Sequence, residues 1–178
     1  MRVRHTDVVD ARPTLDVVER GELLRFAFDD LMRHHGPGSP GGVAIAFKVL
    51  ERGLPLLAGG SPPERRSISV RTAFGGPGAR DAFELVTRAV TDGRYVVDPS
   101  LARAQRGRAL ERFVFELTLR DVSSTLVLRP GFVDDAFIDL ARTERRTPEQ
   151  EARMDELKRD LAARVMAAAA EAVVEVVG

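Results

Sequence analysis

Two adjacent histidines, His34 and His35, open a loop rich in glycine and proline that runs to Gly41. Imidazole gains or loses a proton near neutral pH, so it can serve as a proton shuttle or a metal ligand. Ser39 adds a hydroxyl to the same loop. We therefore expect acid/base chemistry at His35 and His34, with Ser39 beside them.

The backbone of this loop is the second reason to expect a site. Glycines leave N–H groups accessible, and a helix expected from Gly41 onward would add the positive end of its dipole, which attracts anions. The predicted ligand-binding glycines are Gly36, Gly38 and Gly41. The alternative is that both histidines cap the carbonyls at the end of the preceding helix, where a cation is favourable. The neighbouring glycines favour the functional role.

A second glycine-rich stretch, Gly75-Gly76-Pro77-Gly78, precedes another expected helix that carries Arg80 and Asp81 in its first turn. It resembles a phosphate-cradling loop, although the spacings of the known phosphate-binding motifs are absent. The alternative role of Asp81 is to complement the helix dipole. The prediction is that Arg80 binds a ligand and that Asp81 assists catalysis.

Composition limits the classes of function. The 178 residues suit one domain, and 27 basic residues balance 27 acidic ones, which argues against nucleic-acid binding. No cysteine is present, so disulfides and thiolate chemistry are excluded. No apolar run approaches the ~20 residues that a membrane span needs. We expect a cytoplasmic protein with a small-molecule partner and no contact with nucleic acid or membrane.

The pattern of apolar residues predicts the elements that position these loops. Helical spacing is found in residues 15–32, 41–54, 79–91 and 131–142, and a Thr-Pro-Glu-Gln start at Thr147 opens a long last helix whose alanine-rich end covers 165–177. Alternation indicates strands in 66–74 and 94–97 and a hairpin of 113–119 with 122–129. The order predicts an α+β fold with a mixed or antiparallel sheet, a single domain over 15–178 and an arm over 1–14.

The motifs in this order resemble the FmdE-like family of formylmethanofuran dehydrogenase domains, over residues 20 to 176 or nearly the whole chain. The family's H-G-H-x-C-P-G motif corresponds to His35-Gly36-Pro37-Gly38-Ser39-Pro40-Gly41. Its C-x-x-D-A-I-Q motif corresponds to Gly78-Ala79-Arg80-Asp81-Ala82-Phe83-Glu84, and its T-x-G-K to Thr91-Asp92-Gly93-Arg94. The A-F-T-F hairpin and T-P-E-E helix correspond to Arg112-Phe113-Val114-Phe115 and Thr147-Pro148-Glu149-Gln150.

The resemblance implies an α+β domain, often a homodimer, with a metal site built on histidine and cysteine. Ser39 and Gly78 stand where the family has cysteines, and these residues do not replace soft thiolates. No cofactor is therefore expected, and zinc is disfavoured; if a metal is held, its ligands are His34, His35 and Asp81. The retained scaffold is His35, the glycines, Asp81 and Arg94, with Arg94 as an anion clamp.

Two functions follow from these residues. In the first, the chain is a metal-independent enzyme in which His35 is the general acid/base, Asp81 orients it, and the substrate is a small molecule that an anion-attracting loop would suit. In the second, the chain is a non-catalytic ligand-binding or accessory subunit of a larger complex. A metal-binding protein with a histidine/carboxylate site is a further alternative.

Overall fold

A mixed five-stranded sheet forms one layer of the protein. The structure, a computed structural model, describes residues 12–178. The strand order is β4-β3-β5-β6-β7, with β3 and β4 parallel and the other neighbours antiparallel. The strands are β3 (Ile68–Thr72), β4 (Tyr95–Val97), β5 (Val114–Leu119), β6 (Val122–Leu128) and β7 (Val174–Val177). The predicted α+β class and the β5–β6 hairpin are confirmed.

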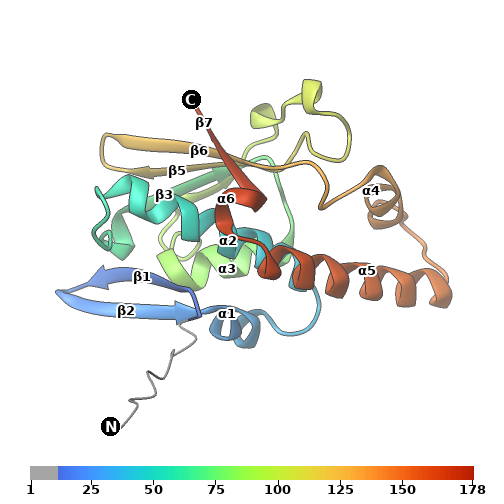
Figure 1. Ribbon diagram of the computed structural model, residues 1–178, viewed down its shortest axis with the longest axis horizontal. Helices are drawn as coiled ribbons and strands as arrows, with labels where there is room; N and C mark the ends of the chain where they lie inside the picture. The colour runs from blue at the N-terminus through green and yellow to red at the C-terminus, as the bar shows by residue number, and fades with distance from the viewer. Residues whose placement is uncertain (1–11) are drawn as a thin grey trace, which may run out of the picture.

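Helices cover one face of this sheet (Figure 1). The central helix α2 (Pro40–Leu57) packs against β5 and β6, and α3 (Pro77–Thr87) and α5 (Pro148–Ala167) pack against α2. The shorter helices are α1 (Phe28–His35), α4 (Asp135–Ala141) and α6 (Ala170–Val173). Alternation in β3 explains the two faces, because Ile68, Val70 and Thr72 are buried under the helices while Arg71 pairs with Glu116 on the other face.

The helix predicted over residues 15–32 is wrong for most of its length. The chain instead forms an antiparallel hairpin of β1 (Thr14–Glu19) and β2 (Glu22–Ala27), and α1 begins only at Phe28. Arg20 and Gly21 both have positive φ, +51° and +79°, as a two-residue hairpin turn requires. Leu15 and Val17 are buried on one side of β1, so the apolar alternation of a strand is present in the sequence. The prediction followed instead an apolar spacing in residues 15–32 that also fits a helix.

The long C-terminal helix is confirmed, but its predicted end is wrong. Thr147 accepts a hydrogen bond from the Gln150 N–H at 3.2 Å, and Gln150 accepts one from the Thr147 N–H at 2.9 Å, as the predicted capping box requires. The helix stops at Ala167, and α6 leads into β7, which pairs with β6. Val174, the first residue of this strand, is buried. The strand forms because the edge of β6 offers hydrogen-bond partners, which a pattern in nearby residues does not show.

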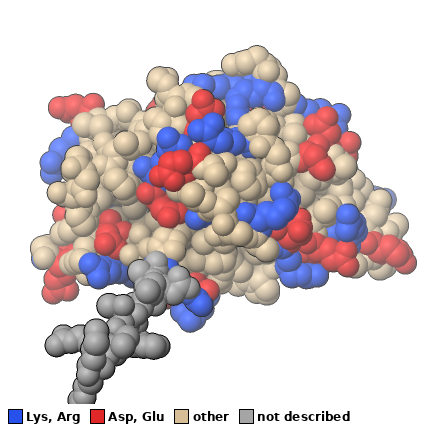
Figure 2. All heavy atoms as spheres, viewed as in Figure 1, with Lys and Arg blue, Asp and Glu red and all other residues tan. Residues whose placement is uncertain are grey.

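The remaining predicted elements agree with the structure within a few residues at their ends. Helix α2 runs past the predicted end at Leu54 and contains Pro55. Most of the predicted arm, residues 1–11, lies outside the described part of the chain. No helix within residues 12–178 is long and apolar enough to cross a membrane. Figure 2 shows acidic and basic side chains interspersed over the face that it views.

Candidate functional site

His35 and Asp81 form a hydrogen-bonded pair between two helices. His35 is the last residue of α1, and Asp81 lies in the second turn of α3, 46 residues later. The distance from His35 Nδ1 to Asp81 Oδ2 is 2.7 Å. The imidazole is only 8% exposed and the carboxylate 31% exposed, so water reaches the pair mainly from the carboxylate side. The sequence singled out both residues, and the fold brings them together.

The second ring nitrogen of His35 has no partner within the described part of the chain. Its Nε2 is buried and makes no hydrogen bond with any residue from 12 to 178. When Asp81 accepts the Nδ1 proton, neutral imidazole keeps a lone pair on Nε2, directed into the protein. A buried polar atom without a partner costs about 1–3 kcal/mol, so such atoms are concentrated where a ligand or a reaction needs them. Among residues 12–178, Nε2 is thus the atom of this pair that is left available for a ligand or a proton.

The glycine/proline loop lies beside this nitrogen. A Cβ atom placed on Gly38 would lie 4.0 Å from His35 Nε2, so the absence of a side chain leaves room next to it. Gly36 ends α1 with φ +87°, a conformation that other residues rarely adopt. Ser39 precedes the first turn of α2, and its hydroxyl makes no capping hydrogen bond. Of the predicted loop residues, Gly38 is therefore the one that lies next to Nε2.

The N-termini of α2 and α3 meet next to the pair. A Cβ atom on Gly78 would lie 2.4 Å from the Ser39 carbonyl oxygen, and one on Gly42 would lie 3.2 Å from Ala79 N. Only glycine permits backbones to approach this closely. Pro40 and Pro77 begin the two helices, and the N–H groups that follow have no acceptor within their own helix. The N-terminus of α3 thus lies one turn before Asp81 and touches the N-terminus of α2, an arrangement favourable to an anion.

Helix α5 closes the outer side of the loop. Lys158 Nζ donates a hydrogen bond to the Gly38 carbonyl oxygen at 3.3 Å, and Gly41 packs against Leu161. A cavity of about 270 Å³ between the loop and α5 is lined by Pro37, Lys158 and Arg159, among others. Lys158 was not among the predicted residues, because a contact across 120 residues leaves no local pattern in the sequence.

Tyr95 is a second residue that the sequence analysis missed. Its hydroxyl is buried and has no hydrogen-bond partner among the described residues. Burial raises the pKa of Tyr95 to about 12; the positive charge of Arg80 opposes this shift, and the negative charge of Asp81 adds to it. The phenol therefore senses the charges of the His35–Asp81 site. The available signal was that Tyr95 is the single tyrosine of the chain and directly follows Arg94.

The other predicted residues Arg80, His34 and Arg94 are not part of the His35–Asp81 hydrogen bond. Arg80 is largely exposed, with Nη1 3.8 Å from Asp81 Oδ1. His34 is exposed at the surface beside His35. Arg94 donates hydrogen bonds to the carbonyl oxygens of Ile68 and Thr87 and to Asp92. The predicted anion clamp therefore has its donors occupied in holding β3, α3 and β4 together.

The histidine/carboxylate ligand set is not assembled in the described part of the chain. Within residues 12–178, no three histidine, aspartate or glutamate side chains converge as a metal ion requires. His35 and Asp81 supply two neighbouring donors, and His34 does not join them. His5 lies outside the described residues. Among the described residues, His35 and Asp81 thus supply two of the three or four donors that a closed metal site has.

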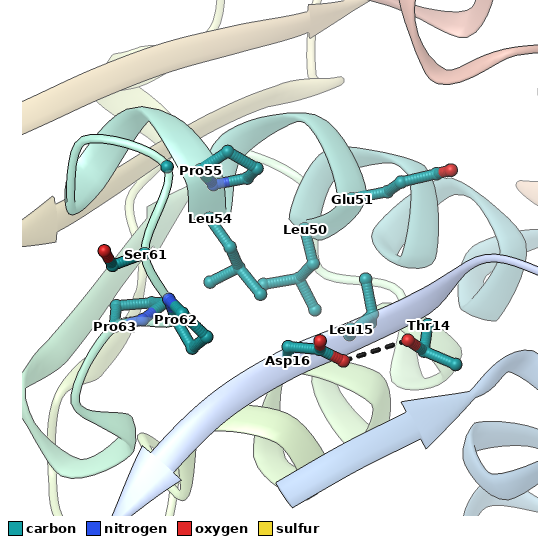
Figure 3. A pocket seen from close by; sticks show the side chains of 11 residues that line it. Thr14, Leu15, Asp16, Leu50, Glu51, Leu54, Pro55, Ser61, Pro62 and Pro63 are labelled. Carbon is teal, nitrogen blue, oxygen red and sulfur yellow. Dashed lines mark hydrogen bonds between the residues drawn. The ribbon is translucent and has the colours of Figure 1, made fainter. Parts of the chain in front are cut away.

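A separate cavity of about 180 Å³ lies between β1, α2 and the loop after α2 (Figure 3). Leu15, Leu50 and Leu54 form its apolar floor. Its carboxylates already have partners, since Asp16 accepts a hydrogen bond from Thr14 and Glu51 Oε2 lies 3.0 Å from Lys48 Nζ. None of the predicted site residues lines this cavity within residues 12–178.

No known protein family and no curated protein matches the chain. The resemblance to the FmdE-like family of formylmethanofuran dehydrogenase domains stays a prediction from its motifs. The His35–Asp81 pair, the free Nε2 and the two helix ends therefore carry the functional argument by themselves.

Proposed function

We propose that the chain is a metal-independent enzyme in which His35 is the general acid/base for a small substrate bound at the His34–Gly41 loop. The observation that carries this proposal is the asymmetry of the imidazole: Asp81 holds Nδ1 at 2.7 Å, while Nε2 is buried without a partner among the described residues. This arrangement fixes the tautomer and keeps one nitrogen available for a proton.

The charges around the pair indicate what happens to that proton. His35 Nε2 accepts it from the substrate, and the imidazolium that forms is stabilised by the Asp81 carboxylate. The N-termini of α2 and α3 and the exposed Arg80 favour negative charge nearby, which supports a substrate that is an anion or becomes one. Ser39 lies on the same loop and would contribute its hydroxyl to binding.

Access to Nε2 requires the loop to give way, because this nitrogen is enclosed. The alternative function is a non-catalytic ligand-binding or accessory subunit, in which His35 only holds a ligand; it needs the same access to Nε2. The two functions share the site and differ in turnover, so they are separable by experiment.

The test is a panel of small carboxylates, phosphate esters and carbonyl compounds, screened for binding by NMR of the histidine ring nitrogens and for turnover. His34→Asn is the matched control for His35→Asn, since the two residues are adjacent and only His35 contacts Asp81. We expect His35→Asn to lower turnover by about 10²- to 10⁴-fold, as loss of a general acid/base does, and His34→Asn to leave it unchanged.

The outcomes separate the functions. Binding that depends on His35 without turnover of any compound would support the non-catalytic subunit. Turnover that survives in His35→Asn would exclude His35 as the acid/base. Zinc bound by the wild type and lost in His35→Asn would support the metal-binding alternative.

We also propose that the protein is a cytoplasmic homodimer, on the basis of the family resemblance and the absence of cysteine. The apolar stripe of α5 gives this proposal no support, because Met154, Leu161 and Val165 are buried within the chain itself. A monomeric mass in analytical ultracentrifugation would overturn the homodimer.

A further inference from the structure

A cavity of about 300 Å³ lies between the β3–α3 connection, the residues before β5 and helix α4. Figure 1 shows α4 on the right of the molecule and the yellow-green segment before β5 at the upper right. The Gly75–Gly76 stretch that the sequence analysis noted lines this cavity, and neither His35 nor Asp81 does. Its size is at the lower end of the range for small-molecule sites.

The cavity has an aromatic platform. Phe74 and Phe113 stack with ring centroids 4.5 Å apart and an interplanar angle of 27°, and Phe115 contacts the Phe74 ring from the edge. Gly76 makes room for this stack, because a Cβ atom there would lie 2.4 Å from Phe74 Cζ. The rings are therefore held in place. Phe113 is only 3% exposed, so the half-buried Phe74 gives the cavity most of this apolar wall, against which another flat apolar group packs well.

The rim of the cavity is basic. Arg108, Arg112 and Arg142 line it, and no acidic residue of the described chain does. Arg108 pairs with Asp139, and Arg142 lies 3.7 Å from Glu111. Arg112 is exposed and makes no ion pair with any residue between 12 and 178. Within residues 12–178, this guanidinium with its planar fork of donors thus has no acidic partner and lies beside an apolar wall.

We propose that this cavity binds a small organic anion with a flat apolar body, such as an aryl carboxylate or an aryl phosphate, and that Arg112 anchors the anionic group. Carboxylate and phosphate both match the guanidinium fork, while the ring of the ligand lies on the Phe74–Phe113 platform. This site is separate from the His35–Asp81 pair and goes beyond the proposed function.

The experiment is a calorimetric and NMR titration of the full chain with four probes: phenyl phosphate, benzoate, benzyl alcohol and inorganic phosphate. We expect at least one aryl anion to bind, to shift the ring signals of Phe74 and Phe113, and to bind more tightly than the neutral alcohol or inorganic phosphate. A preference for phenyl phosphate identifies a phosphate ester as the ligand class, and a preference for benzoate identifies a carboxylate.

Arg112→Gln is expected to weaken binding of the aryl anion about 10- to 100-fold, the usual effect of losing a charge-assisted hydrogen bond. Arg145→Gln, at an exposed position that does not line the cavity, is the matched control and should bind as the wild type does. His35→Asn should also bind normally, so failure of the proposed function leaves this result intact. The proposal is overturned if neither aryl anion binds, if Arg112→Gln binds equally well, or if inorganic phosphate binds as tightly as phenyl phosphate.

Discussion

The pKa of Tyr95 responds to the charges of Arg80 and Asp81. Its titration can be observed alone, because the chain has one tyrosine and no tryptophan. Its buried hydroxyl has a pKa of about 12, with burial as the main cause, Arg80 opposing the shift and Asp81 adding to it. The single phenol can be followed by ultraviolet absorbance without interference. A measurement on one residue therefore tests how the whole cluster is arranged.

We predict that tyrosinate forms near pH 12 in the folded protein and near 10 in urea. Because the folded state disfavours the charged phenolate, this group stabilises the fold below pH 10, and its contribution is lost as the pH rises from 10 to 12. Asp81→Asn removes a negative charge and should lower the pKa of Tyr95, whereas Arg80→Gln should raise it. A folded-state midpoint at the ordinary value, unchanged in Asp81→Asn, would show that the phenol is hydrated and distant from Asp81.

The sequence identified both members of the acid/base pair but could not pair them. His35 was notable for its neighbours in the chain, and Asp81 for its place in a helix turn. That Nδ1 meets Asp81 while Nε2 has no partner among the described residues depends on how α1 packs against α3. The prediction that Arg94 binds an anion did not foresee that its guanidinium donates hydrogen bonds to carbonyl oxygens of β3 and α3, which also depends on how distant elements pack.

At the scale of elements, the contact between α2 and α3 depends on Gly78. Its backbone lies so close to α2 that an added Cβ would be 2.4 Å from the Ser39 carbonyl oxygen and 3.1 Å from Val43 N. Both atoms belong to backbone, so neither moves as a flexible side chain does. This contact sets the position of the loop relative to Asp81, which follows one turn later in α3.

We predict that Gly78→Ala destabilises the protein by about 1–3 kcal/mol through overpacking, although alanine favours helix by up to about 1 kcal/mol. Gly75→Ala is the control, because a Cβ there meets only Val97 at 3.9 Å. Urea unfolding measures both, and the ring nitrogen signals of His35 should change in Gly78→Ala alone. If Gly78→Ala were as stable as the wild type, the two helices would have to lie farther apart.

Elements with strong local signals were predicted well, and those that depend on distant partners were not. The capping box at Thr147 and the alternation in β5 and β6 are properties of neighbouring residues, and both are confirmed. The β1–β2 hairpin was mistaken for helix because Leu24, Phe28 and Leu31 also fit a helical face. Strand β7 exists because β6 offers a free edge, which no pattern near residue 174 indicates.

At the scale of the molecule, the balanced charges are arranged as pairs that join separate elements. Glu19 of β1 contacts Arg65 and Arg66, and Arg66 also contacts Asp92 after α3. Hydrogen bonds from arginine lower the pKa of Glu19 and of Asp92. Such carboxylates hold the fold together when ionised, so protonating them weakens contacts between elements.

Glu84 is the most buried of these carboxylates and ties the end of α3 to the turn before β4. It accepts a hydrogen bond from the Thr91 N–H at 3.0 Å and another from the Thr91 hydroxyl, and Arg88 lies 3.3 Å away. Burial by itself would raise the pKa of Glu84, but the Thr91 hydrogen bonds and the Arg88 charge outweigh it and lower the pKa below 4.5. The ionised form is therefore the one that the folded chain prefers.

We predict that the free energy of unfolding falls as the pH drops below about 4.5, because the unfolded chain then binds the proton of Glu84 before the folded chain does. Glu84→Gln should lower the stability at neutral pH by about 1–3 kcal/mol, the cost of hydrogen bonds to a buried charge, and should make the acid loss less steep. Urea unfolding at a series of pH values measures both effects. Glu144→Gln, at an exposed position between α4 and α5, is the control and should follow the wild type. An acid limb equally steep in Glu84→Gln and in the wild type would mean that the exposed pairs, not Glu84, set the acid stability of the fold.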